Sequence, residues 1–264
     1  MQEGLKPELG IRLQAVADMV REGNCIADIG CDHGFVSIAL IQSGAAKSVI
    51  ACDVKEGPLK AAKEHVAAAG LEDKIDCRLA DGLMGLKENE ADGIIIAGMG
   101  GPLGLRILYD GRDKLKGVNQ VVFQIQSKSA LVRFVLKEWG FETVSEEMVF
   151  EDGKYYVLMD LKVPEETSFY ELTVSDWEAY LNEKEAELSG KNTQELADFT
   201  YGEKLIEKRS PVLLAFLEKE EERLLSVADE LEAHPGEKSA DALGKINESI
   251  DVLMAAKWRI CGIS

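Results

Sequence analysis

The sequence is poor in the residues that build metal centres and disulfide frameworks. It contains three histidines and five cysteines among 264 residues, and no two of the cysteines form a C-x-x-C pair. An odd number of cysteines without paired spacing predicts reduced, mostly buried thiols in a cytoplasmic protein. Because no group of His, Cys and Asp has the spacing of metal ligands, we expect no metal ion.

Long hydrophobic runs are also missing. The longest run that tolerates glycine extends from Gly93 to Leu105, short of the roughly 18 residues that a membrane-spanning helix needs. The first residues, Met-Gln-Glu-Gly, lack the basic segment and apolar block of a secretion signal. We therefore expect a cytoplasmic protein that does not contact a membrane.

Basic residues are scarce relative to acidic ones, 30 against 48, which gives a formal net charge of −18. A charge of this sign argues against a protein that holds nucleic acid on a broad basic surface. The charge is uneven, however. Up to Val163 the chain has 19 basic and 25 acidic residues, so −6 lies there and −12 beyond it.

The sequence does contain a regular alternation of β-branched runs and amphipathic segments. This alternation predicts an α/β fold in which a parallel sheet has helices on both faces. Two further runs, 141–150 and 155–163, flank the turn dipeptide Asp152-Gly153 and predict an antiparallel hairpin at the end of the sheet. The predicted strands of the parallel part are 25–29, 48–52, 74–79, 93–97 and 119–125, and the predicted helices are 35–42, 58–69, 102–110 and 130–139.

After Pro164 the chain becomes rich in Glu and in helix formers, so we expect two domains, 1–163 and 164–264. Apolar residues recur at steps of three, four and seven from Leu213 to Leu231 and again from Leu243 to Ile260. This pattern predicts an antiparallel helical hairpin over about 210–260, with His234-Pro235-Gly236 as its turn. Tyr201-Gly202 and Ser210-Pro211 are expected to be breaks in the segment before it.

The strongest local signal is the segment Ala27-Asp28-Ile29-Gly30-Cys31-Asp32-His33-Gly34, between the first predicted strand and helix. Glycines at such a turn let the backbone approach a ligand closely. A dinucleotide-binding turn reads G-x-G-x-x-G, whereas here Asp28 precedes the first glycine and Asp32 replaces the middle one. Two carboxylates repel a pyrophosphate, but they suit a ligand with a cationic sulfonium and amino group, such as S-adenosylmethionine.

Acidic residues also follow the next two strands. Asp53 comes 23 residues after Gly30, the spacing at which an acid reaches the ribose hydroxyls of a bound nucleoside. Asp81 follows the third strand, where it can accept a hydrogen bond from an adenine amino group. Each acid alone is typical of a cap or a turn. Because the carboxyl ends of successive parallel strands meet at one crevice, the three together predict a nucleoside cofactor.

The fourth strand runs into the glycine-rich segment Gly98-Met99-Gly100-Gly101-Pro102. Enzymes of this fold that methylate amines usually have an Asn or Asp, two prolines and an aromatic residue at this place, which clamp the exocyclic amine. The glycines here leave the loop open to a bulky substrate, or permit a tight turn into the next helix.

Six segments resemble, in their order and spacing, the bacterial tRNA (adenine-22-N1)-methyltransferases (TrmK): LGIRLQAVADMV, ADIGCDHG, ACDVKEGPLKAAKEHV, DGL, IIIAGMGG and EDGKYYV. The resemblance covers about residues 5–163, with a fainter match in the helical hairpin. It implies a Rossmann-like class I methyltransferase domain with a coiled-coil-like C-terminal domain. It also implies S-adenosylmethionine as the donor and N1 of a D-arm adenine in tRNA as the acceptor.

The resemblance implies a role for each matching residue. Asp32 is the candidate catalytic residue, and Arg12, Gly100 and Gly101 are candidates for substrate binding. Gln124-Ile125-Gln126-Ser127 departs from the family, in which a proline often stands in place of Ile125, so we assign no substrate role to Gln124 or Gln126. The implied donor-binding residues are Asp28, Gly30, Asp32, His33, Asp53, Val54, Asp81, Gly82, Gly98 and Met99.

The acidic total limits RNA contact to local basic positions, for which Lys6, Arg12, Arg21, Arg112, Lys114 and Lys116 are candidates. Lys114 and Lys116 are the pair that we expect to bind substrate outside the donor crevice. Each assignment has a simpler interpretation: Asp32 binds only the donor or caps a helix, His33 makes a local hydrogen bond, and Arg12 is solvated.

Three functions remain open from the residues alone. The first is tRNA adenine N1 methylation by a monomeric enzyme. The second is methylation of a small molecule or protein by the same fold, which the acidic charge favours. The third is a nucleotide-binding scaffold without catalysis, and the three acids at the strand ends argue against it.

Overall fold

The computed structural model describes residues 5–21, 23–165, 168–234 and 236–262. Its contacts divide the chain into two compact units, Met1–Ser175 and Asp176–Ser264. Pro235, in the predicted turn of the helical hairpin, lies outside the described residues.

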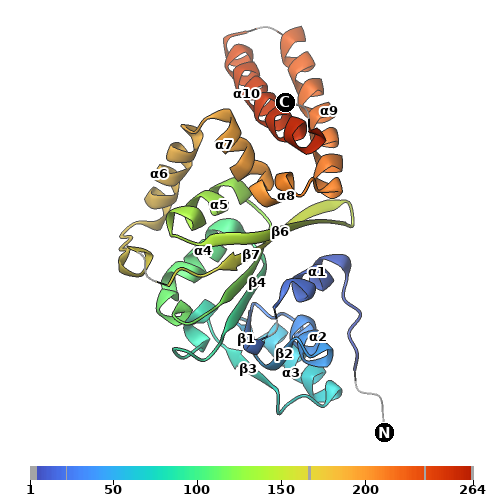
Figure 1. The fold of residues 1–264 in the computed structure, drawn as a ribbon, viewed down its shortest axis with the longest axis vertical. Helices are drawn as coiled ribbons and strands as arrows, with labels where there is room; N and C mark the ends of the chain where they lie inside the picture. Colours follow the sequence, from blue (N-terminus) through green and yellow to red (C-terminus); the bar gives the residue numbers. More distant parts are fainter. Residues whose placement is uncertain (1–4, 22, 166–167, 235, 263–264) are drawn as a thin grey trace. The chain divides into compact units, whose positions relative to one another are not determined.

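The first unit is built on a seven-stranded sheet in the order β3-β2-β1-β4-β5-β7-β6 (Figure 1). The first five strands pair in parallel, and β7 pairs antiparallel with both β5 and β6. This confirms the predicted parallel sheet and its terminal hairpin, which turns at Asp152-Gly153. The strands are β1 (Gly23–Ile29), β2 (Ala46–Asp53), β3 (Ile75–Leu79), β4 (Gly93–Met99), β5 (Gln120–Ile125), β6 (Glu142–Glu151) and β7 (Lys154–Lys162).

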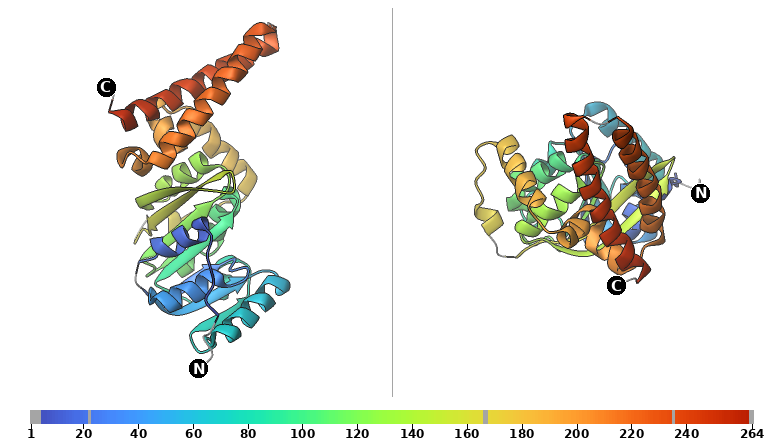
Figure 2. Two further views of the ribbon diagram at one scale, coloured as in Figure 1. Left: turned by 90° about the vertical axis from the view of Figure 1, so that its right-hand side faces the viewer. Right: turned by 90° about the horizontal axis from the view of Figure 1, so that it is seen from above.

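Helices cover both faces of this sheet. Crossovers between parallel strands are right-handed, and the strand order runs outward in two directions from β1 and β4. Helices α2 and α3, which follow β1 and β2, therefore lie on the same face of the sheet as α1. Helices α4 and α5 pack together on the other face (Figures 1 and 2). The helices are α1 (Ile11–Met19), α2 (Phe35–Ser43), α3 (Glu56–Ala69), α4 (Gly101–Asp110) and α5 (Ser129–Glu138), with short 3-10 turns η1 (Gly82–Gly85) and η2 (Arg112–Leu115).

The core follows from the alternation of side chains along the central strands. Val122 of β5 is buried under α1, and Phe123, the next residue, is buried under α4. Gly104 of α4 makes this second contact possible, because a Cβ atom there would overlap the Phe123 ring. The strand order reverses between β1 and β4, so a crevice is expected at their carboxyl ends.

The first unit extends beyond the end of the sheet to Ser175. A 3-10 turn, η3 (Ser168–Glu171), carries Phe169, whose ring centroid is 4.7 Å from that of Trp139. The hydroxyl of Tyr109 donates to the carbonyl of Leu172 (3.3 Å) and accepts from the N–H of Val174 (2.7 Å). These contacts tie the segment after Pro164 to the first unit, so this unit ends later than the change in composition.

In the second unit the described residues form helices and the turns between them, and the last two helices form the predicted hairpin. Ser210 caps α9 by accepting from the N–H of Leu213 (3.3 Å), and Gly202 has a positive φ of 94° at the end of a π-helical turn. Leu213 and Leu253 are fully buried, while Leu243, nearer the turn, is partly exposed. The elements are α6 (Trp177–Ser189), α7 (Thr193–Ala197), η4 (Asp198–Gly202), α8 (Glu203–Glu207), α9 (Pro211–Ala233) and α10 (Glu237–Cys261).

Candidate active site

Asp28, at the end of β1, is a buried carboxylate below the first turn. It is 4% exposed, and the hydroxyl of Ser37 on α2 donates to its Oδ2 at 2.6 Å. Burial raises the pKa of Asp28 to about 6, and the nearby negative charge of Asp53 adds to the rise, while the Ser37 hydroxyl opposes it. A cation that binds beside this carboxyl group would stabilise its ionised form.

The turn after β1 has the backbone geometry that its residues favour. Gly30 has φ 75°, and Asp32 has φ 49°, a left-handed conformation that Asp tolerates better than most residues. The N–H groups of Gly30 and Cys31 both donate to the carbonyl of Cys52 at 2.8 and 3.0 Å. A Cβ atom at Gly30 would lie 2.5 Å from the methyl carbon of Met99, so Gly30 leaves space for that side chain.

Asp53 joins the end of β2 to this turn. Its Oδ2 accepts from the N–H of Asp32 at 3.1 Å, and its Oδ1 accepts from the N–H of Lys55 at 2.8 Å. Each carboxylate oxygen has two acceptor sites, so Asp53 retains acceptor capacity for a ligand hydroxyl. The Asp32 side chain is 70% exposed, and its Oδ1 lies 3.7 Å from Nε2 of His33.

His33 lies beside the turn in a group of three rings. Its ring centroid is 5.8 Å from that of Phe35, and Phe35 stacks on His65 with centroids 4.6 Å apart. Nδ1 of His65 is 2.9 Å from the carbonyl oxygen of His33. These contacts support the local interpretation of His33, although half of its side chain remains exposed.

Exposed apolar side chains accompany the acids at the ends of β2 and β3. Val54 is 60% exposed and Leu79 is 53% exposed. Asp81 is exposed and precedes Gly82, which has φ 53° and faces Ile107. Apolar side chains for an adenine ring, carboxylates for ribose and cationic groups, and a glycine turn for close approach all fit S-adenosylmethionine.

The glycine-rich segment after β4 lies at the same edge of the sheet as Arg12. The guanidinium of Arg12 donates from Nη1 to Oε1 of Gln124 at 2.9 Å, and the N–H of Gly98 donates to the same oxygen at 3.0 Å. The N–H of Gly101 donates to the hydroxyl of Ser127 at 3.3 Å, and a Cβ atom at Gly100 would approach that hydroxyl to 3.3 Å. The predicted donor and substrate residues other than the two lysines are thus gathered at the carboxyl ends of β1 to β4.

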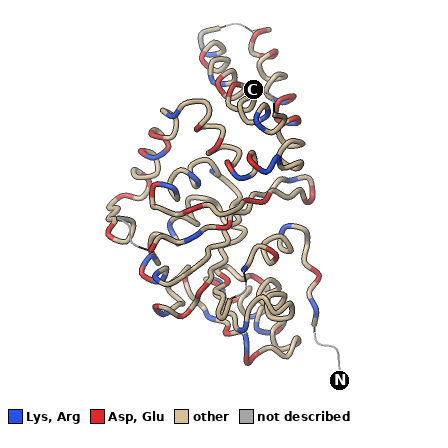
Figure 3. The backbone as a smooth tube through the Cα atoms, viewed as in Figure 1, with Lys and Arg blue, Asp and Glu red and all other residues tan. Residues whose placement is uncertain are grey.

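Lys114 and Lys116 lie elsewhere. They are in and just after η2, between the end of α4 and the start of β5, so they occupy the amino-terminal edge of the parallel strands. Nζ of Lys116 is 5.7 Å from the centroid of the Tyr170 ring. Lys and Arg are interspersed with Asp and Glu along the described chain (Figure 3).

Gln124 and Tyr156 are neighbours of Arg12 that we did not predict from the sequence. Gln124 is fully buried, and the Arg12 guanidinium lies 5.4 Å from the centroid of the Tyr156 ring. The sequence contains a signal for Gln124, because a glutamine in an otherwise apolar buried strand needs partners. It contains none for Tyr156, whose place depends on the pairing of β7 with β5.

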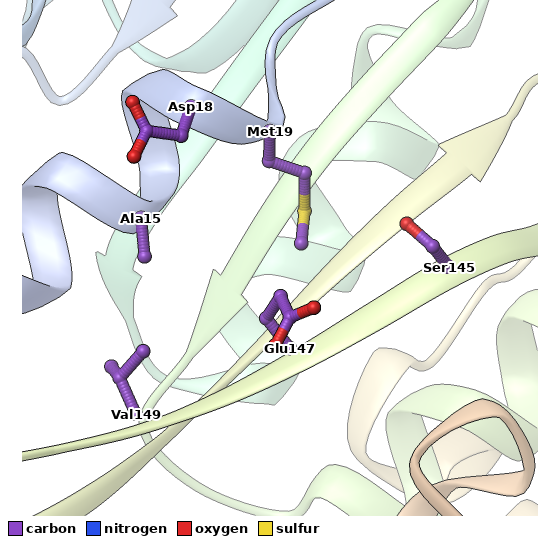
Figure 4. Close-up of a pocket in the computed structure, with 6 residues that line it drawn as sticks. All are labelled: Ala15, Asp18, Met19, Ser145, Glu147 and Val149. Carbon is purple, nitrogen blue, oxygen red and sulfur yellow. The ribbon is translucent and has the colours of Figure 1, made fainter. Parts of the chain in front are cut away.

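A pocket that is separate from the predicted site residues lies between α1 and β6 (Figure 4). None of the residues that line it is a predicted site residue. The pocket is lined by Ala15, Asp18, Met19, Ser145, Glu147 and Val149.

Among the described residues, no group of His, Cys, Asp and Glu has the arrangement of a metal site. None of the described helices combines the length and the apolar composition that a membrane-spanning helix requires.

Comparison with known proteins gives three kinds of match. Residues 9–159 match a family described as a methyltransferase domain. The tRNA (adenine(22)-N(1))-methyltransferase of Bacillus subtilis is 35% identical over 164 residues, which are 62% of this chain and 69% of that enzyme. The ribosomal protein L11 methyltransferase of Enterococcus faecalis is 30% identical over 165 residues, 62% of this chain but 50% of that enzyme.

Two solved structures resemble this chain over nearly its whole length. The M1A22 tRNA methyltransferase TrmK of B. subtilis is 26% identical with a TM-score of 0.75, covering 95% of this chain and 99% of that one. A candidate tRNA (m1A22) methyltransferase of Streptococcus pneumoniae, solved in complex with S-adenosyl-L-methionine, is 29% identical with a TM-score of 0.74. It covers 95% of this chain and is itself covered completely.

Proposed function

The chain belongs to the family of tRNA (adenine(22)-N(1))-methyltransferases, and we propose that it methylates N1 of adenine 22 in the D-arm of a bacterial tRNA. The donor is S-adenosylmethionine, which supplies a methyl group on a sulfonium sulfur. The observation that carries the proposal is the group of acids at this edge, which suits a cationic nucleoside donor. Asp53 accepts from the backbone N–H of Asp32, and its charge acts on the buried carboxylate of Asp28.

We propose that the acids divide the donor among them. Asp53 binds the ribose hydroxyls with the acceptor sites that Asp32 and Lys55 leave open. Asp28 supplies negative charge below the turn, opposite the cationic part of the donor. Asp81 accepts from the adenine amino group beside the exposed side chain of Val54.

The acceptor needs no strong base before the reaction. N1 of neutral adenine attacks the methyl carbon with its own lone pair, the carbon–sulfur bond breaks, and its electrons return to sulfur. The positive charge passes from the sulfonium to the methylated adenine, so a carboxylate at the acceptor stabilises charge as it develops. Asp32, exposed on the turn, is the catalytic residue that we propose for this role.

N1 lies on the Watson–Crick edge, so a paired adenine must leave its partner before it reacts. Gly100 and Gly101 leave a backbone surface against which an extruded base can lie. Arg12, held at the same edge by Gln124, is placed to contact the RNA backbone. Lys114 and Lys116 are proposed to contact a more distant part of the tRNA, because they lie at the opposite edge of the sheet.

The assay that tests this function uses the full chain, a labelled methyl donor and unmodified bacterial tRNA. The modified position is read by mapping reverse-transcription stops. We expect a stop at the D-arm adenine, and no incorporation into the same tRNA with that adenine replaced by guanine. Good donor binding with no transfer to any tRNA would refute the proposal. Sedimentation of the same sample tests the expected monomer, and fractionation of the source cells tests the expected cytoplasmic location.

Methylation of a ribosomal protein is the second candidate, because the match to an L11 methyltransferase covers the same domain. That sequence match includes half of the relative, whereas the sequence match to the B. subtilis tRNA enzyme includes 69% of that enzyme. The solved structure of the B. subtilis tRNA enzyme is also similar over 95% of this chain. Ribosomal protein and tRNA offered together as acceptors distinguish the two candidates, and we expect label in the RNA alone.

A further inference from the structure

We call Arg12 and the Gly98–Gly101 segment the acceptor edge. One side-chain oxygen atom of Gln124 binds both parts of it. Its side chain is fully buried in β5. Oε1 accepts from Nη1 of Arg12 and from the N–H of Gly98, and Nε2 donates to the carbonyl of Ile125 at 2.9 Å. Both lone pairs of the oxygen are therefore used, one for Arg12 in α1 and one for Gly98 near the end of β4.

The contact with Gly98 is needed because β4 is irregular there. The pairing of β4 with β5 shifts between Ala97 and Met99, which leaves Gly98 as an extra residue with φ 77°. A bulged residue has no partner in the strand ladder. The Gln124 side chain supplies the missing acceptor, so it fixes the end of β4, from which the chain turns at Gly100 into α4.

The contact with Arg12 restrains the position of its guanidinium group. Arg12 is near the start of α1, its backbone N–H donates to Oε1 of Glu151 at 3.4 Å, and its guanidinium packs over Tyr156. The bond to Gln124 uses one of the five guanidinium N–H donors. Arginine that is held in place before binding loses less entropy when it contacts a phosphate or a base.

We propose that Gln124 is a positioning residue for tRNA. Its buried side-chain amide fixes Arg12, which contacts the RNA, relative to the Gly98–Gly101 segment, which aligns the acceptor base. This inference rests on the proposed function. It also reverses our expectation from the sequence, which assigned Gln124 no role.

A second buried glutamine provides a matched control. Gln120, four residues earlier on the same face of β5, holds the other end of α1: its Nε2 donates to the carbonyl of Met19 (2.8 Å), and its Oε1 accepts from the N–H of Arg21 (2.9 Å). It is 4% exposed and lies at the amino-terminal end of the strand, away from the acceptor loop. Loss of either glutamine weakens the attachment of α1, but only Gln124 contacts the acceptor edge.

The experiment compares Gln124→Met, Gln124→Glu, Gln120→Met, Arg12→Met and the Arg12→Met/Gln124→Met double variant in the full chain. We measure kcat and KM for unmodified tRNA, the donor Kd by calorimetry, and the unfolding midpoint. Gln124→Met should raise KM for tRNA about 10-fold, as expected for a lost hydrogen bond to a charged group, with donor Kd within about 2-fold. Gln124→Glu keeps the acceptor and should recover part of this loss.

Two comparisons decide the inference. Gln120→Met should lower the unfolding midpoint and leave KM for tRNA unchanged. The double variant should have the same KM for tRNA as Arg12→Met alone, while its kcat falls further because the contact with Gly98 is also lost. Equal effects of Gln120→Met and Gln124→Met on KM, or additive increases of KM in the double variant, would overturn the inference while leaving the proposed function intact. A wild-type chain that binds donor but methylates no tRNA would overturn both.

Discussion

The backbone N–H of Asp32 donates to Oδ2 of Asp53 at 3.1 Å, which joins the turn after β1 to the end of β2. The two acids are 21 residues apart in the chain, and the hydrogen bond fixes the backbone of Asp32 while its carboxylate stays exposed. A substitution that removes the charge of Asp32 can therefore leave its backbone in position. This separation of backbone and side-chain roles makes the catalytic assignment testable.

Asp32→Asn should abolish most of the methyl transfer and preserve donor binding. Asn tolerates the left-handed conformation of this residue and keeps the backbone bond to Asp53. Loss of one group that stabilises developing charge costs about 100-fold or more in kcat. Single-turnover transfer to tRNA measures the loss, and calorimetry with donor is the control. If donor affinity falls in parallel with the rate, Asp32 only binds the donor.

Donor affinity should depend on pH through Asp28. Burial raises the pKa of this carboxyl to about 6, and a cationic donor binds better to the ionised form. Affinity should therefore increase from pH 5 to pH 7 by about 10-fold and level off above it. Calorimetric titration at several pH values measures this change. Asn at position 28 cannot titrate, so the donor affinity of Asp28→Asn should stay constant between pH 5 and pH 7. A wild-type donor affinity that is also constant over this range would argue against the role of Asp28.

Charge reversal of Lys114 and Lys116 to Glu should weaken tRNA binding without changing kcat at saturating tRNA. Both lysines lie at the amino-terminal edge of the sheet, opposite the predicted catalytic turn. A lost phosphate contact also lowers the slope of log affinity against log salt by about one per contact. Binding of tRNA at several salt concentrations measures this slope, with donor affinity as the control. Unchanged affinity and slope would remove this pair from the RNA contact surface.

Gly104→Ala should destabilise the first unit. The added methyl group would overlap the buried ring of Phe123, and overpacking of a core costs about 1 to 3 kcal/mol. Urea unfolding measures the free-energy change. Gly57→Ala is the matched control, because Gly57 is also in a helix but has nothing within 4 Å of an added Cβ. It should be neutral or stabilising by up to about 1 kcal/mol, and equal losses in both variants would contradict the packing argument.

The sequence by itself determined the order of the strands and of the helices between them, and it predicted most of the residues proposed to bind the donor. Hydrophobic periodicity and turn residues are local properties, so the strands and helices between residues 23 and 162 were predicted to within a few residues, and Asp152-Gly153 marked the hairpin. No bounds were predicted for α1 or for the short helices before α9. Asp28, Asp32, Asp53 and Asp81 could be placed together because parallel strands must bring their carboxyl ends to one edge. The segment after Pro164 was harder, because its attachment depends on ring contacts such as Phe169 with Trp139 rather than on composition.

Only the tertiary structure decided which distant residues share the acceptor edge. Gln124 is 112 residues from Arg12, and their bond exists because α1 folds back across β5. The same topology sends Lys114 and Lys116 to the opposite edge, since a crossover helix returns the chain to the amino-terminal end of the next strand. The charge and spacing of residues along the sequence do not predict which of these residues lie close together, because such long-range contacts depend on how the helices pack on the sheet.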